Sequence, residues 1–261
     1  MPTIIVCLKY AIDVTQVKIE SATRKLIIAS ASRKISDFDK NALEEAIKIK
    51  EKFGGEVIAL TLTTEDASSA LREALAMGAD KAYLIKDPIL KDADALVTSF
   101  ILVKAIKKIG RYDLILCGEA SIDSYSAQVG PRLGEILGIP VVSYVRRLSL
   151  EGNIVIAERG LEDCTEVAKA KMPALITVTK EINVPRVPTL MDVIKASKKQ
   201  IVTWTLSDLG VLNEEIRAAI EIVDVSAPKI ERKKVKIEGE TAKEVAEKVV
   251  KALIQEGILK K

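Results

Sequence analysis

Short, nearly continuous apolar runs alternate with longer amphipathic stretches over the first 145 residues of the chain. A continuous apolar run is typical of a strand buried on both faces of a parallel sheet, whereas apolar residues at helical spacing predict a helix with one buried face. The predicted strands are residues 3–8, 56–62, 81–85, 114–117 and 140–145. The predicted helices are residues 39–53, 64–76, 93–109 and 127–137, and a hairpin of residues 17–20 and 25–29 interrupts the first crossover.

This alternation predicts βαβ units, in which each helix returns the chain to the edge of a parallel sheet. The chain therefore belongs to the α/β class, with a doubly wound, mostly parallel sheet. After residue 145 the pattern changes to a short antiparallel extension, followed by one further strand of the main sheet. The extension comprises residues 147–150, 153–157 and 165–170, and the returning strand is residues 174–179.

The last third of the chain has a weaker pattern. Two prolines exclude helix and central strand from residues 183–188, and residues 201–206 predict an edge strand. Residues 207–240 lack a clear period and predict an extended arm, which ends in an amphipathic helix over 241–254. We therefore expect an α/β domain over residues 1–206 and, over 207–261, an arm with a helix suited to holding another subunit.

Composition excludes several kinds of chemistry. The 261 residues include no histidine, which rules out Ser-His-Asp triads, Cys-His nucleophile pairs and imidazole zinc sites, and we expect no metal site. A net charge of only +3 argues against nucleic acid as a partner. No apolar stretch reaches the roughly 18–20 residues of a membrane span, so we expect a soluble, cytoplasmic protein. Cys7 and Cys117 lie in apolar runs and are expected to be buried.

The strand-to-helix connection after residue 117 is the strongest candidate for a binding site. Gly118 ends an apolar run and could let the backbone approach a ligand closely. Free amides at the start of the next helix could bind a phosphate, although an ordinary capped helix explains the same pattern. The chain has no glycine-rich dinucleotide fingerprint, no Walker loop and no nucleophile elbow, which disfavours kinases, NAD dehydrogenases and hydrolases.

Charged residues elsewhere have two interpretations each. Glu158, Arg159 and Glu166 could reach a ligand, but charges on antiparallel strands usually form the solvated face. The basic group Lys195, Lys198 and Lys199 could meet an acidic partner or be plain surface, and Leu190 could be a docking side chain or part of the core.

Several segments together, in order and spacing, resemble the β subunit of electron transfer flavoproteins over nearly the whole chain. The matching residues are Val6-Cys7-Leu8-Lys9 with Asp13, residues 42–46, residues 74–80, Asp113 to Gly118 with Ile122-Asp123, Glu158-Arg159, Lys171-Met172-Pro173-Ala174, Asn183-Val184-Pro185-Arg186 with Thr189-Leu190, and Asp208 to Val211.

This resemblance implies an adenine nucleotide alpha-hydrolase-like, Rossmann-like fold. It also implies an α subunit that carries FAD, an adenine nucleotide in this subunit, and a loop over about residues 182–200 that docks a partner dehydrogenase or quinone oxidoreductase. The docking residues would be Leu190, Lys195 and Lys198. The nucleotide contacts would be Cys7, Ser36, Asp37, Phe38, Asp39, Leu62, Gly118, Ser121, Ile122, Asp123, Ser126, Ala127, Gln128 and Val129.

Two departures from the family pattern bear on the nucleotide. Many members have Asn-Pro where this chain has Ser36-Asp37, which leaves that contact open. Members that bind AMP tend to have Asn-Gln-Thr-Gly-Gln in the phosphate loop, whereas this chain has Ala127-Gln128-Val129-Gly130-Pro131, similar to the branch that binds a second flavin and bifurcates electrons. Val129 also lacks a hydroxyl donor for a terminal phosphate. FAD is therefore favoured over AMP.

With a flavin, the resemblance implies an electron carrier whose redox chemistry belongs to the cofactor. Arg159 is then a candidate for stabilising reduced, anionic flavin. Two other classes remain open: a free-standing adenine-nucleotide-binding module of the universal stress protein type, and an ATP-using ligase or pyrophosphatase of similar fold. The 111 residues after position 150 argue against the first class. Lys9 to Asp13, in place of a glycine-rich loop, argues against the second.

Overall fold

The computed structural model describes residues 1–229 and 233–259. The chain divides into two compact units, Met1–Val225 and Ser226–Lys261. Residues 207–211, which the sequence assigned to the arm, belong to the first unit because Leu209 and Val211 are buried in its core. The two units are described separately below.

The main sheet of the first unit has nine strands in the order β11-β10-β9-β12-β8-β1-β6-β7-β13. Six of them run parallel to their sheet neighbours: β1 (Thr3–Leu8), β6 (Glu56–Thr63), β7 (Lys81–Lys86), β8 (Leu114–Gly118), β12 (Ala174–Val178) and β13 (Ile201–Trp204). The long strand β9 (Val141–Glu151) is parallel to β12, and then pairs antiparallel with β10 (Ile154–Gly160), which pairs with β11 (Thr165–Lys171).

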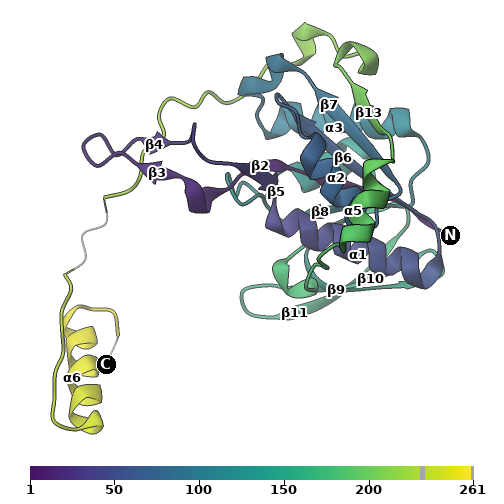
Figure 1. Ribbon diagram of the computed structural model, residues 1–261. Helices are drawn as coiled ribbons and strands as arrows, with labels where there is room; N and C mark the ends of the chain where they lie inside the picture. The colour runs from purple at the N-terminus through teal and green to yellow at the C-terminus, as the bar shows by residue number, and fades with distance from the viewer. Residues whose placement is uncertain (230–232, 260–261) are drawn as a thin grey trace. The chain divides into compact units, whose positions relative to one another are not determined.

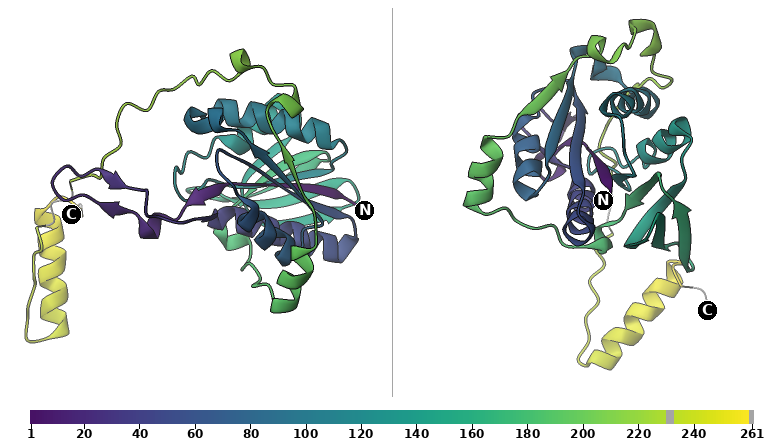
Figure 2. Two further views of the ribbon diagram at one scale, coloured as in Figure 1. Left: turned by 45° about the horizontal axis from the view of Figure 1, so that its top comes forward. Right: turned by 90° about the vertical axis from the view of Figure 1, so that its right-hand side faces the viewer.

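Helices cover both faces of this sheet (Figure 2). The helices are α1 (Asp37–Phe53), α2 (Ser68–Met77), α3 (Ala95–Ile109), α4 (Val129–Leu137) and α5 (Leu190–Ser197). Side chains of α1 and α2 pack in one hydrophobic core, and those of α3 and α4 pack in the other. Strand β1 serves both cores because successive side chains point to opposite faces: Ile4 and Val6 enter the first core, and Ile5 enters the second. The α/β, doubly wound class predicted from the sequence is confirmed.

Three of the differences from the sequence prediction have an identifiable physical cause or change the sheet. Helix α2 begins at Ser68 and not at 64, because Asp66 accepts a hydrogen bond from the Ser68 amide and holds a turn there. The predicted strands at 140–145 and 147–150 form one continuous strand, β9, so the antiparallel extension belongs to the main sheet. Helix α5 was not predicted at all; its short length and its exposed apolar side chains obscure the helical period.

The first crossover contains the expected hairpin. Strands β2 (Tyr10–Ile12) and β5 (Arg33–Ile35) pair at its base, and β3 (Lys18–Ile19) and β4 (Leu26–Ile27) pair further out. The β3–β4 pair projects away from the sheet layer (Figure 1). Single-turn helices η1 (Val14–Gln16), η2 (Pro88–Asp92), η3 (Lys180–Ile182), η4 (Ser207–Leu209) and η5 (Asn213–Glu215) connect other elements of this unit.

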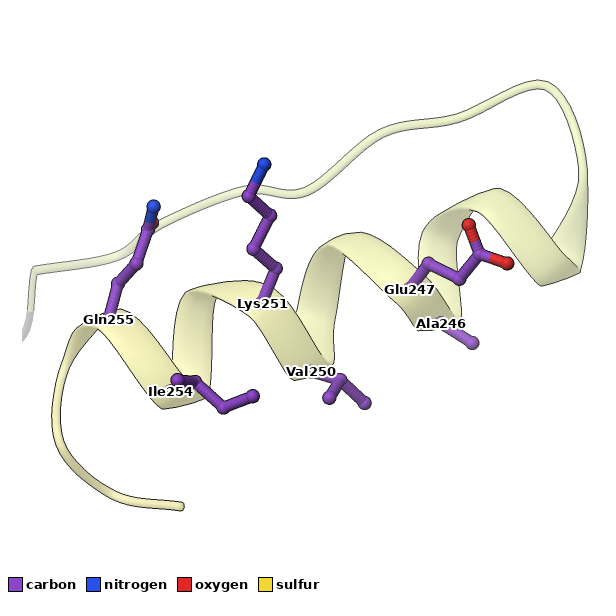
Figure 3. Close-up of a pocket in the computed structure, with 6 residues that line it drawn as sticks. All are labelled: Ala246, Glu247, Val250, Lys251, Ile254 and Gln255. Carbon is purple, nitrogen blue, oxygen red and sulfur yellow. The ribbon is translucent and has the colours of Figure 1, made fainter. Parts of the chain in front are cut away.

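The second unit contains α6 (Ala242–Gln255), and its Thr241 side chain accepts a hydrogen bond from the Glu244 amide. Ala246, Val250 and Ile254 lie one turn apart and point to the same side of the helix, where they line a shallow apolar concavity (Figure 3). The helix is thus amphipathic, as the sequence predicted. Within the described parts of the chain, no helix combines the length and the apolar character needed to cross a bilayer.

Candidate functional site

The order of the strands defines a crevice at the carboxyl ends of β1 and β8. From β1 the chain proceeds through β6 and β7 on one side and then crosses to β8 on the other side of β1, where β12 and β9 also lie. The order therefore reverses between β1 and β8, and in open α/β sheets ligands bind at such a switch point, outside the carboxyl ends of the strands. We call this the switch-point crevice.

Most of the nucleotide contacts predicted from the sequence lie around the switch-point crevice. Cys7 and Gly118 are at the ends of β1 and β8, Leu62 is near the end of β6, and Ser36 immediately precedes α1. The first turn of α1, the loop after β8 and the start of α4 supply the others: Asp37, Phe38, Asp39, Ser121, Ile122, Asp123, Ser126, Ala127, Gln128 and Val129.

Asp39 links the ends of the two strands at this crevice. One carboxylate oxygen accepts a hydrogen bond from the Gly118 amide at 2.8 Å, and the other accepts one from the Lys9 amide at 2.8 Å. The side chain is buried, and burial raises the pKa of Asp39 to about 7, although these two hydrogen bonds and the charge of Lys9 oppose the rise. Asp39 therefore titrates close to neutral pH beneath the crevice.

Lys9 attaches the loop after β8 to the end of β1. Its Nζ lies 2.6 Å from Asp123 Oδ1 and donates to the hydroxyls of Ser121 at 3.2 Å and Ser124 at 3.3 Å. Burial raises the pKa of Asp123, but the hydrogen bond and charge of Lys9 outweigh burial, so the pKa lies below its ordinary value. The Ile122 amide donates to Ser36 Oγ at 3.3 Å, which fixes the same loop to the start of α1.

Gly118 has a packing role that the sequence did not reveal. A Cβ atom at this position would lie 2.5 Å from Cβ of Phe38 and 2.9 Å from its carbonyl carbon. The first turn of α1 thus occupies the space that a side chain would need. The sequence analysis expected Gly118 to allow a ligand to approach the backbone closely. In the structure it is the first turn of α1 that approaches closely.

The start of α4 has the features of an anion site. The amides in the first turn of a helix have no partner within the helix, and here neither a side-chain cap from Gln128 nor an acidic residue occupies that turn. Tyr125 and Ala127, with φ of 48° and 53°, adopt the left-handed conformation that is uncommon for residues other than glycine. The Gln128 side-chain oxygen accepts from Arg132 at 3.0 and 3.1 Å, so a cation lies beside this helix start.

Arg159 lies on the same cross-strand row as Gly118. The register pairs Gly118 with Val178, Val178 with Val145, and Val145 with Arg159. Three strand spacings separate the two ends of the row, or roughly 14 Å. The Nε atom of Arg159 is buried without a hydrogen-bond partner among the described residues, although a Glu166 carboxylate oxygen lies 3.4 Å away. A buried donor of this kind usually has a partner.

Three further residues lie at this edge: Glu119 and Tyr125 are in the strand-to-helix connection that the sequence indicated, whereas Lys180 was missed. The Tyr125 ring packs edge-on against the Phe38 ring, with centroids 5.7 Å apart. Lys180 Nζ also contacts the Phe38 ring, 4.8 Å from its centroid. Burial, followed by the nearby charge of Glu181, raises the pKa of Glu119. The position of Lys180 just after β12, where strand ends meet the crevice, was the signal that could have identified it.

The two strand cysteines are buried, as predicted. Hydrogen bonding with Cys7 and burial both raise the pKa of the Cys117 thiol. A buried thiol with a raised pKa is a poor nucleophile, so Cys117 is not a reactive cysteine. Among the described residues, no cluster of three or more Cys, Asp and Glu side chains could hold a metal ion.

The predicted docking residues are on a different part of the first unit. Leu190 begins α5 and is 76% exposed, and Lys195 and Lys198 are also exposed. Helix α5 packs against α2. The expectation that Leu190 could be a core residue is thus excluded, and Lys199 differs from its neighbours because its Nζ donates to the Ala79 carbonyl at 2.6 Å.

Comparison with known proteins agrees with this arrangement. Residues 11–209 match the family model described as "Electron transfer flavoprotein domain". The "Electron transfer flavoprotein subunit beta" of Thermoanaerobacterium thermosaccharolyticum is 43% identical over 88% of this chain and 89% of the relative. The chain belongs to the family of electron transfer flavoprotein β subunits.

Two other relatives of this β-subunit family span most of the chain. The "Electron transfer flavoprotein subunit beta" of Clostridium acetobutylicum is 37% identical over 97% of this chain and 98% of the relative. The "Caffeyl-CoA reductase-Etf complex subunit CarD" of Acetobacterium woodii is 40% identical over 81% of each chain. The resemblance stated from the sequence motifs is therefore confirmed, and with it the assignment to electron transfer.

Proposed function

We propose that this β subunit binds FAD along the switch-point crevice and passes electrons as a carrier between a dehydrogenase and an acceptor. The observation that carries the proposal is the row from Gly118 to Arg159, which joins the predicted nucleotide loop to a buried guanidinium nitrogen without a hydrogen-bond partner among the described residues. Its length of roughly 14 Å, three strand spacings, suits a dinucleotide better than a mononucleotide.

The residues around the crevice fit such a group. The amides at the start of α4 and the adjacent Arg132 favour the phosphates, and the Phe38 and Tyr125 rings offer apolar surface beside them. Arg159 would place a positive charge at the other end of the row. A bound flavin supplies the redox chemistry, and the chain binds, orients and electrostatically tunes it.

FAD is favoured over AMP by two further observations. Val129 occupies the first position of α4 and offers no hydroxyl for a terminal phosphate. The CarD relative belongs to a named reductase complex, which favours a similar role, including electron bifurcation, for this chain. The second candidate is a carrier that does not bifurcate and holds a structural AMP in the same crevice. Family membership disfavours the free-standing nucleotide-binding module.

The partner of this chain would be an α subunit that carries a further FAD. The apolar stripe of Ala246, Val250 and Ile254 on α6 gives this second unit a surface suited to contact with another subunit. Electrons would then enter from a partner dehydrogenase, or leave to a quinone oxidoreductase, through a surface that includes Leu190, Lys195 and Lys198.

Nucleotide content tests the proposal directly. The chain is produced together with its α subunit, the complex is purified and denatured, and the released nucleotides are identified by chromatography. Two flavins per heterodimer are expected. One flavin with one AMP would replace the proposal by the second candidate, and absence of both flavin and AMP would defeat the role as a nucleotide-binding subunit.

Arg159→Ala provides a prediction for the far end of the row. Loss of the guanidinium should lower the reduction potential of the flavin in this subunit, because a positive charge stabilises the reduced, anionic form. The potential is measured by redox titration of the two-subunit protein. Arg111→Ala is the matched control, because that arginine is exposed and pairs with Asp113. An unchanged potential in Arg159→Ala would refute the role of Arg159.

A further inference from the structure

The segment over residues 183–199, which contains α5, is attached to the first unit at both ends while its middle is exposed. Val187, Leu190, Met191, Val193 and Ile194 all have large exposed fractions, between 44% and 89%. An exposed apolar stretch gains little from burial, so its own side chains do not hold it in place. We call residues 183–199 the docking segment.

The first attachment joins the start of the docking segment to α1. Arg186 forms a two-pronged ion pair with Glu44, with Nε 2.9 Å from Oε2 and Nη2 3.1 Å from Oε1. The backbone amide of Arg186 donates to the same Glu44 carboxylate at 3.1 Å, and its guanidinium also contacts Glu51 at 2.5 and 3.0 Å. The hydrogen bonds that Arg186 donates to Glu51 and Glu44 raise the pKa of Arg186 further above its ordinary value.

Reciprocal amide hydrogen bonds strengthen this attachment. Asn41 Nδ2 donates to the Asn183 carbonyl at 2.8 Å, and Asn183 Nδ2 donates to the Asn41 carbonyl at 3.0 Å. Asn183 also donates to Glu45 at 3.0 Å. Asn41, Glu44 and Glu45 are all buried, although polar and charged side chains are rarely buried without partners. Three buried polar residues of α1 are thus committed to the start of the docking segment.

The second attachment joins the end of the docking segment to α2 and the turn after it. Arg72 of α2 donates to the carbonyl of Ala196 at 2.7 Å and to that of Lys199. Lys199 Nζ donates to the Ala79 carbonyl, and the Ala196 side chain is buried. Between the two attachments, Thr189 and Asp192 form a reciprocal cap that starts α5. The backbone that carries the exposed apolar side chains of the docking segment is therefore held in place at both ends.

We propose that Arg186 and Arg72 are positioning residues, which hold the docking segment in the conformation that its protein partner binds. This inference rests on the proposed function, in which the docking segment contacts a dehydrogenase. A segment that is already ordered loses less conformational entropy on binding, so anchoring should increase affinity without adding any contact to the partner. Arg186 carries the larger part, because its fork geometry satisfies a buried carboxylate that no lysine could match.

The first test measures backbone hydrogen exchange across the docking segment in the two-subunit protein. Arg186→Gln should accelerate exchange of the amides in residues 184–197 by about tenfold or more, because local opening no longer breaks the Glu44 pair. Arg186→Lys, which retains the charge without the fork, should give an intermediate rate. Lys195→Gln is the matched control on the same segment and should leave exchange unchanged.

Two outcomes of the exchange experiment would overturn the inference. Exchange in Arg186→Gln that stays within about twofold of the original protein would mean that the ion pair does not order the segment. Acceleration that extends equally to β1 and β8 would mean that Arg186 supports the whole fold and has no specific relation to the docking segment.

The second test separates positioning from contact with the partner. With a dehydrogenase established as donor to the original protein, Arg186→Gln and Arg72→Gln should raise KM for that dehydrogenase by about tenfold with kcat and nucleotide content retained. Leu190→Ala should raise KM without altering exchange. Unchanged KM in both arginine variants would refute the inference. Failure of the original protein to bind any nucleotide would instead refute the proposed function.

Discussion

At the scale of single residues, the crevice is organised by one carboxylate. From the first turn of α1, Asp39 accepts hydrogen bonds from the Lys9 amide, just after β1, and from the Gly118 amide, at the end of β8. The sequence could identify Asp39 only through family resemblance, because an acidic residue at a helix start usually favours the helix dipole from the surface. Its burial, which gives it a pKa of about 7, depends on Gly118 and so on a contact between residues far apart in the chain.

Asp39→Asn should change the pH dependence of stability. Because burial raises the pKa of Asp39 to about 7 in the folded protein, the folded state binds an extra proton between about pH 4 and pH 7. The free energy of unfolding therefore falls, through this group, by up to about 1.4 kcal/mol per pH unit as the pH rises through that window. The stability advantage of the original protein over Asp39→Asn should shrink from pH 4 to 7 and then stay constant.

Urea unfolding at several pH values measures this difference. Asp66→Asn is the control, because hydrogen bonds from Ser68 lower the pKa of Asp66 and its contribution is lost only as the pH falls below about 4. A gap between the original protein and Asp39→Asn that does not vary with pH would show that Asp39 stays ionised throughout.

Gly118→Ala should destabilise the first unit by at least about 2 kcal/mol, because the added Cβ atom meets the backbone of α1 and cannot be accommodated by a side-chain rotation. Gly160→Ala is the control, since a Cβ there meets nothing closer than the Arg146 side chain at 3.7 Å. Thermal unfolding of both variants checks the difference. Equal stability of the two would mean that α1 can move away from β8 at little cost.

At the scale of elements, the parallel strands and the long helices were predictable, because their buried faces repeat with a regular period. Helix α5 was not, because it has eight residues with one buried side chain and is held by Arg72, Arg186 and its own cap. The same reason explains why the continuity of β9 escaped prediction. Both α5 and β9 depend on hydrogen bonds to residues elsewhere in the chain. The spacing of apolar residues within a short segment does not reveal those partners.

Leu190→Ala tests the role of α5. The side chain is 76% exposed and begins the helix, so its truncation should leave the fold and the nucleotide content intact. Electron transfer with a partner dehydrogenase should slow about tenfold, as is usual for a central apolar contact. Stopped-flow kinetics and nucleotide analysis measure the two properties. Loss of nucleotide in this variant would show that Leu190 supports the crevice instead.

At the scale of the whole molecule, the chain combines a large α/β unit with a second unit that lacks a substantial core. None of the described residues of α6 is buried, although the helix has an apolar stripe. A helix of this kind gains stability when its stripe is covered by a partner. The sequence indicated the arm and its helix, but residues 207–225, which it assigned to the arm, belong to the first unit, where Leu209 and Val211 are buried.

Removal of residues 226–261 should separate folding from assembly. The first unit keeps both of its hydrophobic cores and should remain folded, whereas its affinity for the α subunit should fall by about a hundredfold or more through loss of the α6 contact surface. Circular dichroism and analytical size exclusion with the α subunit check the two expectations. Full retention of the complex would place the subunit contacts entirely on the first unit.

The row from Gly118 to Arg159 has a consequence for how such a carrier tolerates mutation. In the proposed site, FAD would extend along this row, whose length is set by three strand-to-strand spacings. Backbone hydrogen bonds set the spacing of strands, and side chains scarcely alter it. Side-chain substitutions along β12 and β9 should therefore leave the distance between Gly118 and Arg159 unchanged. Only a change of strand register or an inserted strand would alter this distance.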